Sequence, residues 1–194
     1  MKKLSRGDLY SLEKYSELRQ QFRARVMEHK KHRRVPLGDI AALYFEDALT
    51  MQYQVQEMLR AERIFEAAGI QEELDAYNPL IPDGNNWKAT FMIEVADESE
   101  RRRKLADLKG IEDAVWMRVD GFEPVFAVAD EDLERSDADK TSSVHFLRFE
   151  LTAPMIEAAK NGASLGAGIA YRGYTHQLEP LPDNIRKSLL VDLD

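Results

Sequence analysis

The feature that most constrains this chain is a change of hydrophobic period at residues 77–86. Before this segment, apolar residues recur every three or four positions, which is typical of amphipathic helices. After it, they alternate over short runs, which is typical of strands. Two prolines and an Asp-Gly-Asn-Asn cluster within the segment predict a connection. We therefore predict a helical region 1–76, a connection 77–86 and a sheet region 87–194 that pack as one compact unit.

In the first region, residues 40–46 resemble a short strand and Asp47 is placed to cap the helix that follows. Apolar residues at helical spacing extend this helix over residues 48–67. Gly69 is placed to end it, because glycine readily takes the left-handed conformation that follows many helices. A short helix over residues 70–76 then precedes the connection.

The second region predicts the element order β-α-β-β-β-α-β-β. Its strongest local signal is the dipeptide at Asp120 and Gly121, which favours a two-residue hairpin turn. Residues 130–140 predict an acidic loop. Short connections favour a mainly antiparallel sheet with helices on one face, so the predicted class is α+β. A ferredoxin-like plait with an extra strand is one form that this class can take.

The charge is unevenly distributed, although the net charge is −8. Residues 1–37 hold eleven Lys or Arg and four Asp or Glu, so a basic head precedes an acidic body. Such a head can lie on its own body, face solvent or bind an acidic partner. Nucleic-acid binding by the basic run 23–34 is disfavoured, because that run lacks aromatic residues and the rest of the chain is acidic.

Several classes of function are excluded by residues that the sequence lacks. There is no cysteine, which excludes disulfides, thiolate nucleophiles and cysteine-held clusters. No apolar run is long enough to span a membrane, and no apolar signal segment follows the first residues, so we expect a cytoplasmic protein. Neither a nucleophile elbow nor a metalloprotease motif occurs. The residues therefore define no reaction and no cofactor, and enzymatic activity stays an open question.

Isolated candidates for chemistry are weak. The glycine-rich run 162–168 lacks the spacing and the lysine of a phosphate-binding loop. His29 and His32 are three residues apart on a predicted helix, which can place two imidazoles on one metal ion. Their four Lys and Arg neighbours repel such an ion, so they are weak metal candidates. His145 shares a strand face with apolar residues, which favours a buried, hydrogen-bonded histidine.

The densest polar group lies on the helix predicted at 48–67. Four of its members form one row along the helix, with a glutamate beside it: Gln52, Gln56, Arg60, Arg63 and Glu57. Amide and guanidinium groups make directional contacts with carboxylates or phosphates, so the row is a candidate for binding an anionic ligand or a partner. The structural alternative is that the row holds the helix against the sheet through buried polar contacts.

A pocket between the two regions is a further hypothesis. Its predicted lining combines residues of the helix, the connection and one strand: Gln52, Gln56, Glu57, Arg60, Tyr77, Asn78, His145 and Arg148.

Four longer runs are similar to a bacterial family known as domain of unknown function 3501 (DUF3501). They are RARVMEHKKHRR at 23–34, FEDALTMQYQVQEMLRAERI at 45–64, ELDAYNPLIP at 73–82 and KTSSVHFLRFELT at 140–152. The resemblance extends over essentially the whole chain and implies no particular reaction. Genes of this family are commonly found beside those for a rubrerythrin and an iron–sulfur oxidoreductase. The resemblance therefore implies an accessory role with these partners in oxidative-stress handling.

Overall fold

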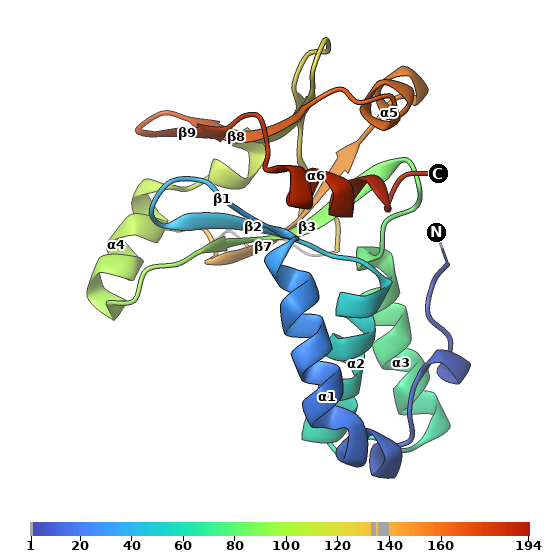
Figure 1. Ribbon diagram of the computed structural model, residues 1–194. Coiled ribbons are helices and arrows are strands. Elements are labelled where there is room, and N and C mark those ends of the chain that lie inside the picture. Colours follow the sequence, from blue (N-terminus) through green and yellow to red (C-terminus); the bar gives the residue numbers. More distant parts are fainter. Residues whose placement is uncertain (1, 133–134, 136–139) are drawn as a thin grey trace.

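The structure, a computed structural model, describes residues 2–132, 135 and 140–194. It confirms the α+β class, because a group of helices adjoins antiparallel sheets (Figure 1). Most of the acidic loop predicted at 130–140 lies outside the described residues.

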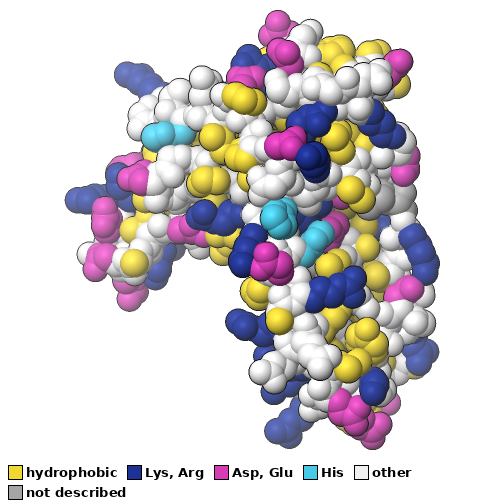
Figure 2. All heavy atoms as spheres, in the orientation of Figure 1, with side chains coloured by type: hydrophobic (Ala, Val, Ile, Leu, Met, Phe, Trp, Pro, Cys, Tyr) yellow, Lys and Arg dark blue, Asp and Glu magenta, His cyan; other side chains and the backbone are white. Residues whose placement is uncertain are grey.

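Three helices form an arm that extends from one side of the sheets (Figure 1). They are α1 (Leu12–Lys31), α2 (Ala48–Ala61) and α3 (Ala67–Tyr77). Ser11 and Asp47 cap α1 and α2, because each side chain accepts a hydrogen bond from a backbone amide of the first turn. The short helix η1 (Arg6–Asp8) precedes the arm, and the helix η2 (Asn78–Leu80) follows it. Figure 2 shows basic side chains along the α1 edge of the arm.

The end predicted for the second helix is wrong. The helix predicted over 48–67 ends earlier, where Arg63 takes a left-handed conformation with φ of 56° and the amide of Ile64 bonds the carbonyl of Leu59. Gly69 instead lies inside α3, where a β-carbon would stand 2.7 Å from the Ile64 side chain. Gly69 therefore allows the turn at Ile64 to pack closely against α3, and Arg63 takes the left-handed position that was predicted for the glycine.

The described strands form two antiparallel sheets, where the sequence predicts one. The five-stranded sheet has the order β1-β2-β3-β7-β6 and the four-stranded sheet the order β5-β4-β8-β9. Their bounds are β1 (Arg34–Pro36), β2 (Ala41–Phe45), β3 (Asn86–Ile93), β4 (Val115–Val119), β5 (Val125–Phe126), β6 (Val128–Ala129), β7 (Val144–Glu150), β8 (Leu165–Tyr171) and β9 (Tyr174–Leu178). Because β1 and β2 precede residue 77, the helical region contributes two strands to the first sheet.

The remaining helices belong to the second region: η3 (Ile111–Ala114), α4 (Glu98–Asp107), α5 (Ala153–Lys160) and α6 (Asp183–Leu190). No described helix is long and apolar enough to cross a membrane. In Figure 1, α6 lies on the side of the first sheet opposite the helical arm.

The main core includes the inner face of the first sheet, where alternate residues of β3 are buried. Trp87, Ala89 and Phe91 all point inward and are at most 2% exposed. The indole Nε1 of Trp87 donates to the carbonyl of Leu189 at 3.0 Å, which fixes α6 against the sheet. The intervening residues of β3, which include Lys88, point to the opposite face, on the side of the arm.

The junction between the arm and the C-terminus is a buried ion-pair network around Arg33. This side chain is 2% exposed, and its NH2 lies 2.5 Å from Asp192 Oδ2. It also donates to the carbonyls of Phe45, Glu46 and Ser188 at 3.0–3.2 Å. Asp47, the α2 cap, lies 3.5 Å from the same guanidinium and 2.5 Å from His29 Nε2. One arginine therefore connects β2, the start of α2 and the last helix.

Candidate functional site

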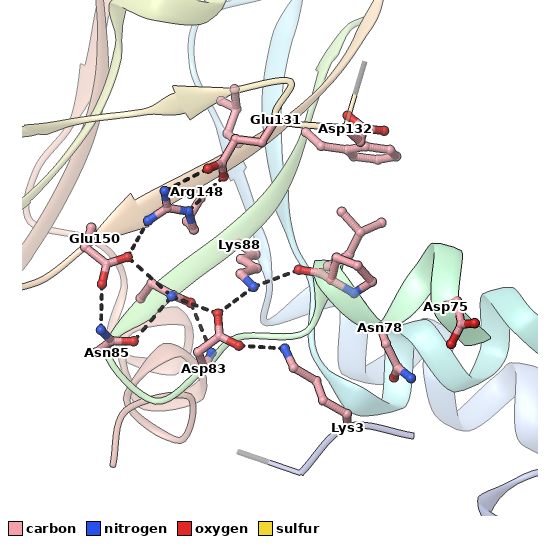
Figure 3. A pocket seen from close by; sticks show the side chains of 15 residues that line it. Lys3, Asp75, Asn78, Asp83, Asn85, Lys88, Glu131, Asp132, Arg148 and Glu150 are labelled. Atoms are coloured by element: carbon pink, nitrogen blue, oxygen red, sulfur yellow. Dashed lines mark hydrogen bonds and ion pairs between the residues drawn. The ribbon is translucent and has the colours of Figure 1, made fainter. Parts of the chain in front are cut away.

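A charged pocket of about 920 Å³ lies where the helical arm meets the outer face of the first sheet (Figure 3). It is lined by the N-terminal segment, the end of α3 with η2, the start of β3, the segment after β6, and β7. Its charged lining residues are Lys3, Asp75, Asp83, Lys88, Glu131, Asp132, Arg148 and Glu150. The pocket therefore depends on the tertiary structure, because these segments are far apart in the sequence.

Two lysines meet at Asp83 on one side of the pocket (Figure 3). Lys3 Nζ lies 2.7 Å from Asp83 Oδ1, and Lys88 Nζ lies 2.6 Å from Asp83 Oδ2. Burial raises the pKa of Asp83, but the hydrogen bonds from Lys3 and Lys88 outweigh it and hold the pKa well below its usual range. Burial also lowers the pKa of Lys88, which brings this amine closer to losing its proton.

Arg148 is held between two glutamates on the sheet side of the pocket. Its Nε and NH2 donate to the two oxygens of Glu131 at 2.8 and 2.9 Å, which is a bidentate pair. Its NH1 donates to Glu150 Oε2 at 2.5 Å. The hydrogen bond from Arg148 lowers the pKa of Glu131, so that carboxylate stays ionised near neutral pH. Asn85 donates to the other oxygen of Glu150.

Strand register places these groups together. Lys88 of β3 pairs with Arg148 of β7, and Asn86 pairs with Glu150 two residues along. Because side chains alternate along a strand, all four point to the same face. An apolar part of the lining, made of Pro79, Leu80, Phe146 and Leu147, adjoins them.

Comparison with known proteins identifies the family of this chain. Residues 3–193 match the model described as protein of unknown function DUF3501. The chain belongs to the DUF3501 family. It is also similar to a crystal structure of a novel protein of unknown function from Burkholderia pseudomallei K96243, with 51% identity, full coverage of both chains and a TM-score of 0.94. No curated protein matches. The resemblance predicted from the four sequence runs is confirmed, and these relatives name no reaction.

Of the residues that the sequence predicts for a pocket in this DUF3501 protein, the structure brings Asn78 and Arg148 into the lining. Asn78 also bonds both the amide and the carbonyl of Leu4, at 2.8 and 2.9 Å, and so holds the N-terminal segment beside the pocket. The predicted members on α2 lie elsewhere, because the polar face of α2 is turned toward the N-terminal segment and α1. Tyr77 and His145 are also outside the lining.

The glutamines of α2 hold the N-terminal segment by its backbone. Gln52 donates to the carbonyl of Asp8 at 2.6 Å. Gln56, which is fully buried, accepts from the amide of Tyr10 at 2.6 Å and donates to the same residue's carbonyl at 3.4 Å. The two glutamines therefore make polar contacts that hold parts of the fold together, as in the structural alternative. The segment that they hold is the N-terminal segment, whereas the alternative named the sheet.

The remaining members of the row have separate surroundings. Glu57 accepts hydrogen bonds from Arg19 and from the Tyr15 hydroxyl, and the hydrogen bond from Arg19 lowers its pKa to about 2. Arg60 is exposed beside it, and Arg63 stands at the end of α2. Tyr77, the predicted pocket residue at the end of α3, is half-buried, and burial raises the pKa of its hydroxyl.

The predicted histidines lie apart from the pocket. His29 bonds Asp47, while His32 Nδ1 lies 3.0 Å from the side-chain amide of Asn184. His145 is fully buried on the inner face of β7, which is the face opposite Arg148. Its burial and hydrogen bonding agree with the reading of it as a buried histidine.

Sequence reasoning missed most of the pocket: Lys3, Asp83, Lys88, Glu131 and Glu150. The nearest signal was the alternation in β3 and β7, which places Lys88, Arg148 and Glu150 away from the apolar face. The sequence around Lys3 and Glu131 does not indicate that these residues lie beside β3 and β7, because that placement depends on how distant segments pack.

Proposed function

We propose that this DUF3501 protein binds a small organic cation in the charged pocket. Around the pocket, five carboxylates face three cationic side chains, and one of the five, Asp132, pairs with Arg135 outside the lining, so four carboxylates and three cations remain. Each of these cations has a carboxylate partner: Lys3 and Lys88 bind Asp83, and Arg148 binds two glutamates. The excess of negative charge favours a ligand with an amine or guanidinium group.

The shape and the lining support a ligand of moderate size. A volume of about 920 Å³ is within the upper part of the range seen for small-molecule sites. Pro79, Leu80 and Phe146 offer an apolar wall for the carbon chain of such a ligand. The charged groups would then fix its cationic end. Lys88, whose pKa burial lowers, is the group best suited to proton transfer if the ligand is also a substrate.

We expect agmatine or spermidine to bind the purified protein and glutarate not to bind, as measured by isothermal titration calorimetry at pH 7.5. Replacing both Glu131→Gln and Glu150→Gln removes two carboxylates of the lining and should weaken amine binding at least about tenfold. Both side chains are exposed, so the fold should be retained. Glu123→Gln, an exposed carboxylate outside the pocket, serves as the matched control. Equal binding by the double variant and this control would contradict the proposal.

A second candidate is the accessory role that the family resemblance implies, beside a rubrerythrin and an iron–sulfur oxidoreductase in the cytoplasm. The observation that favours docking to another protein is Phe65, which is 70% exposed in the turn between α2 and α3. It borders an apolar cavity of about 720 Å³ with Leu59, Ile64 and Ile70. Large exposed aromatic side chains of this kind are frequent at sites where proteins associate.

We expect affinity purification from the native host, under anaerobic and reducing conditions, to recover those two partners with the unmodified chain. Phe65→Ser should reduce their recovery, because it removes the exposed ring while leaving the core intact. Val191→Ser changes a similarly exposed apolar residue near the C-terminus, which does not line this cavity, and should have no effect. Recovery of neither partner by the unmodified chain would rule out this role.

A further inference from the structure

A second polar cluster lies on the inner side of β7, on the opposite face from the charged pocket. At its centre is His145, which is fully buried. Glu112 of η3 is 7% exposed, and Asp130 directly follows β6. The two carboxylates and the imidazole bring their ligand atoms within 4.8 Å of one another. None of these three side chains lines the pocket proposed above for an organic cation.

The ring of His145 is oriented by one carboxylate. Nδ1 lies 2.6 Å from Asp130 Oδ2, so the hydrogen of the neutral ring belongs on Nδ1. The lone pair of Nε2 then points toward three oxygens: Thr141 Oγ1 at 2.9 Å, the carbonyl oxygen of Ser142 at 3.1 Å and Glu112 Oε2 at 3.8 Å. A carboxylate behind a histidine is the arrangement that commonly orients metal-binding imidazoles.

The atoms around Nε2 are mainly acceptors. A carbonyl and a carboxylate have no hydrogen to donate, and the Thr141 hydroxyl donates to Glu112 Oε2 at 3.0 Å. The Thr141 hydroxyl has a single hydrogen, so it cannot donate to Glu112 Oε2 and to Nε2 at the same time, and the Ser142 carbonyl has none to donate. A cation beside Nε2 can accept lone pairs from the imidazole and from these oxygens together.

The spacing of these atoms fits an ion. Ligands at right angles around an ion with bonds of about 2.1 Å lie about 3.0 Å apart. The three shortest separations, from Nε2 to Thr141, from Nε2 to Ser142 and from Thr141 to Glu112, are 2.9, 3.1 and 3.0 Å. Glu112 Oε2 is the most distant of these oxygens from Nε2, at 3.8 Å.

The local charge favours a divalent ion over a proton. Asp113 interacts electrostatically with Glu112, Asp130 and His145, and Arg135 pairs with Asp130 at 3.1 Å. Among the described residues, three carboxylates and one arginine are therefore shown near His145. These four groups sum to two negative charges, so a proton on the ring leaves one negative charge, whereas a divalent ion leaves none.

We propose that this cluster binds one divalent first-row transition-metal ion, with His145 Nε2 and a Glu112 carboxylate oxygen as the ligands on which affinity depends. The Thr141 hydroxyl and the Ser142 carbonyl complete the coordination, and Asp130 orients the ring. An imidazole with oxygen ligands suits zinc and manganese ions.

The test uses the full chain, freed of metal with a chelator, and titrations with Zn²⁺ and Mn²⁺ followed by calorimetry. One ion per chain is expected. Glu112→Gln, which keeps the side-chain volume and the acceptor for Thr141, should weaken binding at least about tenfold. Asp113→Asn is the matched control, because it removes the same charge from the adjacent residue, and its affinity should change by less than about threefold.

Nitrogen NMR of the His145 ring gives a second readout that a merely electrostatic effect would not change. Addition of Zn²⁺ should shift the Nε2 resonance and leave the hydrogen on Nδ1. Three results would overturn the proposal: no stoichiometric binding, equal losses in Glu112→Gln and Asp113→Asn, or a ring that is doubly protonated at pH 7 and insensitive to Zn²⁺.

Discussion

Replacing Arg33 with methionine is expected to lower the free energy of unfolding by about 3–5 kcal/mol. The methionine side chain fills similar space, but the change leaves Asp192 and Asp47 without their shared counter-charge. It also removes the donor to the buried carbonyl of Phe45. Such groups cannot regain water without opening the junction between the arm and α6. Denaturant unfolding followed by circular dichroism measures the loss.

Arg34→Met is the matched control for this change. Arg34 is the next residue, and its side chain is 41% exposed and pairs with Glu94 at 3.0 Å. Exposed pairs of this kind contribute about 1 kcal/mol or less, because water solvates both charges when the pair breaks. If the two variants lose similar stability, the buried network does not hold the junction as described.

The second large effect is a dependence of stability on pH that arises from Asp192. Burial raises the pKa of this carboxyl to about 6, although Arg33 opposes the shift. The folded state therefore holds a proton that the unfolded state has already released, and the free energy of unfolding falls as pH rises from about 4 to about 7. The largest contribution is about 3 kcal/mol. Asp192→Asn mimics the protonated group, so its stability should exceed that of the unmodified chain at pH 7.5 and match it near pH 4.

The measurement is urea unfolding of both proteins at steps between pH 4 and pH 8, compared as a difference so that other titrating groups cancel. Asp183→Asn is the control, since Asp183 is exposed at the start of α6, the helix that precedes Asp192, and the hydrogen bond from Lys187 lowers its pKa. A constant difference between Asp192→Asn and the unmodified chain across this range would contradict the raised pKa.

Local patterns predicted much of the fold. The cap at Asp47 and the change of period at residues 77–86 depend on neighbouring residues, and the corresponding elements are present. A turn also forms at Asp120 and Gly121, but the predicted two-residue hairpin is wrong, because β4 and β5 pair through Met117 and Val125 and the connection between them is longer. The predicted end of α2 was wrong because Gly69 was interpreted as a residue that ends a helix, whereas Gly69 allows a close contact with Ile64. From the sequence alone, a glycine that allows two segments to approach closely cannot be distinguished from a glycine that forms a turn.

The candidate sites were predicted less completely for a related reason. Arg148 and Asn78 were recognised as polar residues in the right regions, but their partners Glu131 and Leu4 lie 17 and 74 residues away. His145 was recognised as buried, whereas Glu112 and Asp130 were not, since η3 and the end of β6 reach it only through the packing of the two sheets. Ion pairs over such separations form when distant segments pack together.

The sequence by itself therefore determined the α+β class and the identity of most helices and strands, because these follow from short-range spacing of apolar, capping and turn residues. It also determined the family, through the resemblance of its four longer runs. The tertiary structure alone decided that the strands divide into two sheets, that α2 turns its glutamines toward the N-terminal segment, and that a charged pocket and a histidine–carboxylate cluster lie on opposite faces of β7. The physical reason is that each of these features depends on the burial of side chains from several distant segments, and the free energy of that burial depends on the whole packed arrangement.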